Sequence, residues 1–134
     1  MKKKKLSIGR YKRKLWTLYS EYIRRKDANA DGCTNCVTCG KYLHWTELQA
    51  GHFLAGRSNG ILFVEGNTFP QCVGCNVFKH GNLEEFYPYM LKTFGDEKIQ
   101  ELKRLKRTTV KLDSTWYEEK IKDYDDKLGA LEKK

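Results

Sequence analysis

Cys36-Val37-Thr38-Cys39 and Cys72-Val73-Gly74-Cys75 are the two stretches of this 134-residue sequence that decide its fold. Each stretch sets two thiols three positions apart. Such a pair can supply two corners of a tetrahedral Zn²⁺ site, because a tight turn brings both sulfurs onto one ion. The two pairs are separated by 32 residues, which is more than the roughly 15 to 20 residues of the commonest pattern. A hairpin and loops are therefore expected between them.

A fifth cysteine offers a different choice of ligands, because Cys33 and Cys36 also form a CxxC pair. We favour Cys36 with Cys39, since Gly40 follows directly and permits the turn that a zinc knuckle requires. Cys33 is then a spare thiol. Two matched pairs argue against the plainer interpretation that all five cysteines are small buried apolar residues. Four-thiolate zinc sites usually serve folding, so the pattern predicts a structural Zn²⁺.

The formal net charge of +9 is concentrated near the N-terminus. Residues 1–26 hold 11 of the 26 Lys and Arg residues and one acid, whereas the other 108 residues balance 15 bases against 16 acids. A basic segment suits a polyanion such as nucleic acid, although a solubilising tail would have the same composition. No apolar stretch fits a signal peptide or a membrane span, so we expect a cytoplasmic protein with no membrane partner. Thiols stay reduced there, which favours metal ligation over disulfides.

Apolar residues at helical spacing predict a basic amphipathic helix over residues 8–26. Further along, the run 61–64 lies between two glycines and is typical of a strand. Asn82, three residues before Glu85, resembles a capping box for a helix over 83–94 that contains Pro88 and ends at Gly95. Two more helices are expected, over 96–107 and from Asp113 or Ser114 to 128.

These elements predict an α+β fold in which flanking α-helices surround a small zinc module of the treble-clef kind. We divide the chain into a basic N-terminal arm and helix over 1–32, the four-cysteine module over 33–95, and C-terminal helices over 96–134. The last helix carries an apolar stripe that fits either packing on the module or a homodimer face. Its members are Trp116, Tyr117, Ile121, Tyr124 and Leu128.

Between and beside the cysteine pairs lie three further motifs, Ala50-Gly51-His52-Phe53, Asn67, and Asn76 to His80. In this order they resemble the HNH (ββα-metal) nucleases, in which a hairpin His, a loop Asn and a helix His or Asn share a metal-centred site on a zinc-braced scaffold. The resemblance implies that the catalytic residues are His52, Asn67, Asn76 and His80. His52 suits the general base that activates water, and His52 and Asn76 are the expected ligands of a catalytic Mg²⁺ or Mn²⁺. For DNA binding we expect Lys12, Arg13, Lys14, Arg57 and Lys79.

A closer resemblance, over roughly residues 33–107, is to the NinG (Rap) family of phage recombination proteins. It is carried by Cys36-Val-Thr-Cys39-Gly40, Ala50-Gly51-His52-Phe53, Asn67, Gln71-Cys72-Val-Gly-Cys75-Asn76, Lys79, Gly81-Asn82 and Phe94-Gly95. The resemblance implies a structure-specific endonuclease that cuts D-loops and Holliday junctions in the host cytoplasm. Branched DNA and other recombination proteins would then be its partners.

Two positions depart from these patterns, and plainer functions stay open. Gly51 stands where many HNH enzymes have an acidic metal ligand, and Phe69 stands where some NinG relatives have His. His52 could instead bond to the backbone, Asn67 could cap a turn, and Asn76 could cap a helix. The main alternative is therefore a non-catalytic, zinc-stabilised DNA-binding accessory protein. A protein-interaction adaptor would leave the basic arm unexplained.

Overall fold

Helix α1, Ile8–Arg25, confirms the predicted basic amphipathic helix. In this computed structural model, which describes residues 5–56 and 58–132, the Ser7 hydroxyl caps the helix by accepting from the Arg10 backbone N–H. One side chain per turn is buried along a single face. The four are Tyr11, Leu15, Tyr19 and Ile23. The bases occupy the other sides, so α1 joins an apolar core to a charged surface.

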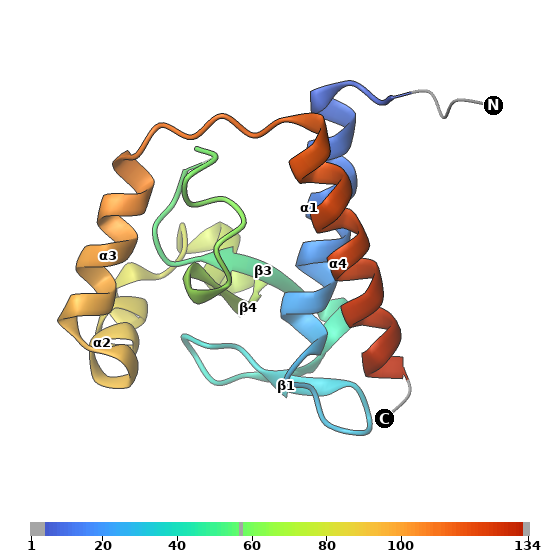
Figure 1. Ribbon diagram of the computed structural model, residues 1–134. Coiled ribbons are helices and arrows are strands. Elements are labelled where there is room, and N and C mark those ends of the chain that lie inside the picture. Colours follow the sequence, from blue (N-terminus) through green and yellow to red (C-terminus); the bar gives the residue numbers. More distant parts are fainter. Residues whose placement is uncertain (1–4, 57, 133–134) are drawn as a thin grey trace.

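Helix α4, Ser114–Glu132, lies along α1 and covers that apolar face (Figure 1). The Asp113 carboxylate caps it by accepting from the Trp116 backbone N–H at 2.8 Å, and the helix continues beyond the expected end at residue 128. Its stripe of Tyr117, Ile121, Tyr124 and Leu128 is buried. The stripe therefore packs in the core of this chain, chiefly against α1.

Two antiparallel pairs of strands carry the cysteine motifs. Strand β1, Cys33–Asn35, pairs with β2, Tyr42–His44, and the first cysteine pair lies in the turn between them. Strand β3, Leu48–His52, pairs with β4, Thr68–Cys72, in a register that sets Leu48 opposite Cys72 and His52 opposite Thr68. The hairpin expected between the cysteine pairs is confirmed.

The strand expected over residues 61–64 is wrong, because this segment forms a turn. The backbone N–H groups of Ile61 and Leu62 both donate to the Ser58 carbonyl oxygen, at 3.1 and 3.0 Å, and so are not available to a ladder. Both side chains are nevertheless fully buried. The apolar run reflects burial of a loop against the core and not a strand.

Helices α2, Leu83–Phe94, and α3, Asp96–Arg107, are present as predicted. Gly95 separates them with φ 88°, a left-handed value that favours glycine. The capping box is wrong: Asn82 has φ 50° and makes no side-chain cap. Its amide is used elsewhere, as a donor to the Cys75 sulfur at 3.4 Å.

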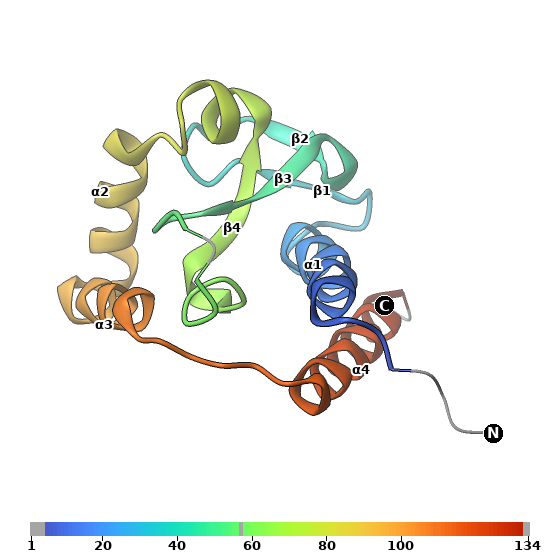
Figure 2. The same ribbon diagram turned by 90° about the horizontal axis from the view of Figure 1, so that it is seen from above.

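The two helix pairs lie on opposite sides of the β3–β4 hairpin (Figures 1 and 2). Each pair closes its own cluster of buried apolar residues, one between α1, α4 and β3 and the other between α2, α3 and the loop after β3. The segment from α3 to α4 crosses over that loop. None of the helices in the described ranges is long and apolar enough to cross a membrane.

Replacing Gly60 by Ala should destabilise the protein, because the added Cβ would lie 2.3 Å from the Leu105 carbonyl oxygen and 2.8 Å from that of Thr108. Forced separation of the loop from α3 should lower the free energy of unfolding by about 1 to 3 kcal/mol. Gly129→Ala is the matched control, since its Cβ meets nothing within 4 Å in a helix. It should raise stability by roughly 0.5 to 1 kcal/mol. Urea denaturation measures both; equal stabilities would contradict the close packing of the loop.

Candidate functional site

Four cysteine sulfurs meet where the two hairpins touch. Cys36 and Cys39 come from the β1–β2 turn, Cys72 ends β4, and Cys75 lies in the π-helical turn η3, Gly74–Phe78. All four sulfurs lie within 4.8 Å of one another. The turn is possible because Gly40 has φ 80°, and the Val37 N–H donates to the Pro70 carbonyl at 2.9 Å. That bond fixes the first pair against β4.

This geometry fits a tetrahedral metal ion. Four sulfurs at about 2.3 Å from Zn²⁺ would be separated by about 3.8 Å, and the Cys39 and Cys72 sulfurs are 3.7 Å apart. The four cysteines could therefore hold a structural metal such as zinc. Cys33 is not part of the group; its sulfur faces the Asp31 carbonyl oxygen at 3.9 Å.

Hydrogen-bond donors surround the sulfurs, as thiolates require. The Cys75 N–H donates to the Cys72 sulfur at 3.4 Å, and the Thr38 hydroxyl lies 3.3 Å from the Cys36 sulfur. Burial opposes ionisation of Cys36, but the hydrogen bonds from Thr38 and backbone N–H groups outweigh it and lower its pKa to about 6. For Cys39 the Lys41 backbone lowers the pKa, whereas burial and the neighbouring thiols raise it, to about 12 overall. Thiols this close ionise together only beside a cation.

A second feature is a cavity of 290 Å³ that His52, Asn76 and His80 line together. Its remaining walls are Ala55, Gly56, Leu62 and Gly81. His52 ends β3, whereas Asn76 directly follows the fourth cysteine. Three of the four residues expected to be catalytic thus share one cavity.

Contacts with Leu62 and Trp16 help to set the position of the His52 ring. Its Nε2 lies 3.0 Å from the Leu62 carbonyl oxygen. Because a carbonyl can only accept, Nε2 is protonated, and in the neutral ring the lone pair is then on Nδ1. The ring also stacks on Trp16 of α1, with centroids 5.3 Å apart and 19° between the planes. Trp16 cannot be recognised as a site residue from the sequence, because helical spacing marks it only as part of an amphipathic face.

Asn76 and His80 reach the cavity from η3 and the residues after it. Asn76 donates through Nδ2 to the Gln49 side-chain oxygen at 2.7 Å, so its Oδ1 is the atom left to accept or to bind a cation. His80, Gly81 and Asn82 all have positive φ, at 51°, 95° and 50°. Such a run is costly for residues with a side chain and persists only where the surroundings hold it.

Asn67 is fully buried and is not among the residues that line the cavity. Its amide bonds twice to Leu54, accepting from the backbone N–H at 2.9 Å and donating to the carbonyl at 3.1 Å. Leu54 is two residues beyond His52. Asn67 therefore holds the chain that leaves β3, which is a positioning contact and not contact with a substrate.

Position 51 has space only for glycine, because the Gln71 side chain packs directly over it. A Cβ at position 51 would lie 1.9 Å from the Gln71 Oε1. Gln71 in turn donates through Nε2 to the Thr38 hydroxyl and the Gly81 carbonyl, at 3.1 and 3.0 Å. An acidic side chain at position 51 is thus incompatible with the glutamine that ties the cysteine knuckle to the His80–Asn82 turn.

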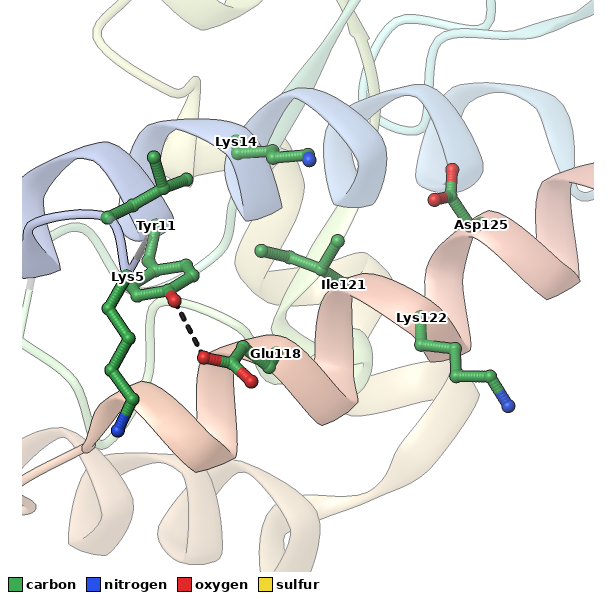
Figure 3. Close-up of a pocket in the computed structure, with 8 residues that line it drawn as sticks. Lys5, Tyr11, Lys14, Glu118, Ile121, Lys122 and Asp125 are labelled. Atoms are coloured by element: carbon green, nitrogen blue, oxygen red, sulfur yellow. Dashed lines mark hydrogen bonds between the residues drawn. The ribbon is translucent and has the colours of Figure 1, made fainter. Parts of the chain in front are cut away.

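The expected DNA-binding bases do not form one cluster. Lys12 donates to the Asn59 side-chain oxygen at 3.3 Å, beside the loop that borders the cavity. Lys79 is exposed just before His80, and Arg13 is exposed on α1. Lys14 faces α4 instead (Figure 3). Arg57 lies outside the described residues.

A larger hollow than this cavity is a groove of 620 Å³ along the seam between α1 and α4 (Figure 3). The Tyr11 hydroxyl donates to Glu118 across it at 2.7 Å. That hydrogen bond is the main reason that the pKa of Tyr11 is raised. The groove has mixed charges and no metal-binding cluster, so we place the functional site at the cavity of His52.

The fold and these contacts define a small α+β protein with a four-cysteine cluster that could hold a metal and a cavity lined by two histidines. The chain belongs to the NinG family: the family described as "Bacteriophage Lambda NinG protein" matches residues 1–134. "Protein ninG" of Salmonella phage P22 is 30% identical over 112 residues, which cover 78% of this chain and 53% of that protein. "Protein ninG" of Escherichia phage lambda is 29% identical over 109 residues, covering 76% and 51%. The chain spans about half the length of these relatives, and no solved structure matches it.

Replacing Cys72 by Ser should remove both the bound zinc and the native fold, because Cys72 joins β4 to the metal and structural zinc contributes directly to folding free energy. The purified wild-type protein should contain one Zn²⁺ per chain. Cys33→Ser is the matched control and should keep both. Elemental analysis and thermal unfolding monitored by circular dichroism measure the effect. Loss of zinc from the Cys33 variant would show that the ligand set is different.

Proposed function

We propose that this protein is a metal-dependent, structure-specific DNA endonuclease of the HNH type that cuts branched intermediates of phage recombination, such as D-loops and Holliday junctions. The observation that carries the proposal is the shared cavity of His52, Asn76 and His80 beside the cysteine centre. Two imidazoles and an amide in one cavity can supply a base and cation ligands. The NinG family and the basic face of α1 support DNA as the substrate.

In this mechanism His52 is the general base. The Leu62 carbonyl holds Nε2–H, so the lone pair on Nδ1 takes the proton from the attacking water. The water oxygen then bonds to phosphorus, the bond from phosphorus to the leaving deoxyribose oxygen breaks, and that oxygen takes a proton from solvent water. The resulting imidazolium keeps its hydrogen bond to Leu62 and afterwards releases its proton to solvent. Trp16 limits rotation of the ring, and Asn67 keeps the following backbone in place through Leu54.

The Asn76 Oδ1 and the His80 imidazole are the donors that would hold a divalent cation. Ligation by His52, which the sequence also suggested, does not fit this mechanism, because the one lone pair of its ring serves as the base. When bound, the cation would stabilise the charge that gathers on the pentacovalent phosphate. Amide and imidazole donors suit Mn²⁺ better than Mg²⁺, which proteins usually hold through carboxylates. DNA phosphate oxygens would complete the ligand set, and Lys79 would contact a neighbouring phosphate.

The order of the elements around the four cysteines supports the proposal that this part of the chain is a treble-clef module. A cysteine knuckle, a hairpin and a second cysteine pair follow one another in the order that this class of module requires. Here the second pair spans the end of β4 and a π-helical turn, where the class has the start of an α-helix. The turn and the residues directly after it still bring Asn76 and His80 to one cavity.

A second candidate, a non-catalytic DNA-binding recombination protein, is favoured by one observation. Among the described residues that line the cavity none is acidic, and Gln71 keeps the position before His52 small. If this alternative holds, the protein binds four-way junctions but leaves them intact in Mn²⁺. Incubation of the protein with matched linear, D-loop and four-way junction DNA, with and without Mg²⁺ or Mn²⁺, distinguishes the two functions.

His52→Ala should lower the cleavage rate by about 10²- to 10⁴-fold, the usual contribution of general-base catalysis. Zinc content and junction affinity should persist, because His52 is not one of the four residues whose sulfurs form the cysteine cluster. His44→Ala is the control: this histidine bonds to Thr46 and lies outside the cavity. Single-turnover cleavage of a labelled junction provides the rate. A folded His52→Ala variant that cleaves the junction at the wild-type rate would contradict the mechanism.

Asn76→Ala should raise the Mn²⁺ concentration that half-maximal cleavage requires, since it removes a cation ligand and leaves the base in place. Cleavage at saturating Mn²⁺ should recover more fully than in the His52 variant. A metal titration at fixed protein and DNA measures the shift. An unchanged titration curve would remove Asn76 from the ligand set.

A further inference from the structure

We propose that residues 103–111, at the end of α3 and in the linker that follows, form a second phosphate-binding surface. Together with Lys12 of α1, this surface would hold the DNA backbone on both sides of the loop 55–60, which borders the His52 cavity. The inference rests on the proposed function only in that the protein must bind DNA. It does not require that the protein cuts DNA.

The charge of this segment is all of one sign. Between Leu102 and Leu112 there are five cations and no acid. They are Lys103, Arg104, Lys106, Arg107 and Lys111. Within the described part of the chain none of the five forms an ion pair, and all except Lys103 are exposed. The C-terminal dipole of α3 favours cations in its last turn, but Lys111 lies beyond that turn.

The segment is joined directly to the loop of the cavity. The Ser58 hydroxyl donates to the Lys106 carbonyl and the Asn59 amide donates to the Val110 carbonyl, both at 3.2 Å. The Lys106 side chain passes beside Gly56, since a Cβ on that glycine would lie 3.4 Å from the Lys106 Cε. Gly56 is itself a wall of the cavity. The basic segment therefore lies directly beside the wall of the candidate catalytic cavity.

One side chain connects this segment to the basic face of α1. Asn59 donates through Nδ2 to Val110 and accepts through Oδ1 from the Lys12 ammonium, at 3.2 and 3.3 Å. The linker crosses over the loop from one helix pair to the other (Figures 1 and 2). A DNA strand laid across the loop would therefore meet cations from α1 and from the α3 end, with the cavity between them.

The composition of the segment favours a phosphate backbone over a protein partner. Protein interfaces depend on buried aromatic or aliphatic anchors and are depleted in lysine. Between residues 103 and 111 the exposed side chains are long cations, two threonines and one valine. Flexible cations and hydroxyls are the groups that contact phosphate without reading sequence, as an enzyme directed by DNA shape requires.

The test compares two double variants that each remove two charges. Lys106→Gln with Arg107→Gln removes cations of the proposed surface, whereas Lys92→Gln with Lys122→Gln removes exposed cations of α2 and α4. Binding of a four-way junction is measured without divalent metal over a range of salt concentrations. Each lost phosphate contact should flatten the slope of log affinity against log salt by about 0.9, and lower affinity roughly tenfold at about 0.1 M salt.

We expect the first pair to flatten the slope by about 1 to 2 and the control pair to leave it nearly unchanged. Equal effects of the two pairs would overturn the inference, because net charge alone would then explain binding. No effect of the first pair, with zinc content and thermal stability intact, would also overturn it while leaving DNA binding in place. Failure of the wild-type protein to bind any DNA would instead reject the proposed function itself.

Discussion

The meeting of four cysteine sulfurs at one point is the constraint on which the rest of the molecule depends. The apolar residues are divided between two separate clusters, one under α1 and α4 and one under α2 and α3. A third cluster lies between them and consists largely of the cysteines themselves, with Leu48. A metal at this point would brace the contact between the two hairpins. Small chains often need such a brace, because a limited core supplies little net stability.

The four cysteines also determine where the candidate catalytic side chains lie. Asn76 follows Cys75 directly, so fixing the sulfur fixes the turn that carries the amide. His80 comes four residues later, in backbone with positive φ that would relax if unsupported. Support comes from Gln71, which bonds to the Gly81 carbonyl, and from Asn82, which bonds to the Cys75 sulfur. These contacts with the cysteine cluster therefore offset the unfavourable conformational free energy of the residues at positive φ.

The loop between β3 and β4 shows how irregular backbone can still be held in place. Asn67 holds its beginning at Leu54, and Asn59 attaches its middle to the α3–α4 linker. The Leu62 carbonyl then meets the His52 ring. The His52 tautomer is therefore a consequence of how the whole loop folds, and not of the residues next to His52.

Covalent spacing and local propensity determined much of this protein. The CxxC pairs, with Gly40 after the first, indicated which four cysteines form the cluster, because a tight turn brings its two thiols close together. The length of chain between the pairs indicated the hairpin. Helical periodicity predicted α1, and cap or stop residues predicted α2, α3 and α4, which are equally local signals. The basic run 103–111 was equally visible, but summing charge over the whole C-terminal region hid it. Only the tertiary structure decided that residues 61–64 form a turn, since apolar character reports burial and not backbone pairing. It also decided that Asn82 donates to the Cys75 sulfur and that the Gln71 side chain leaves no room for an acidic residue at position 51. Only folding brings these residues next to each other.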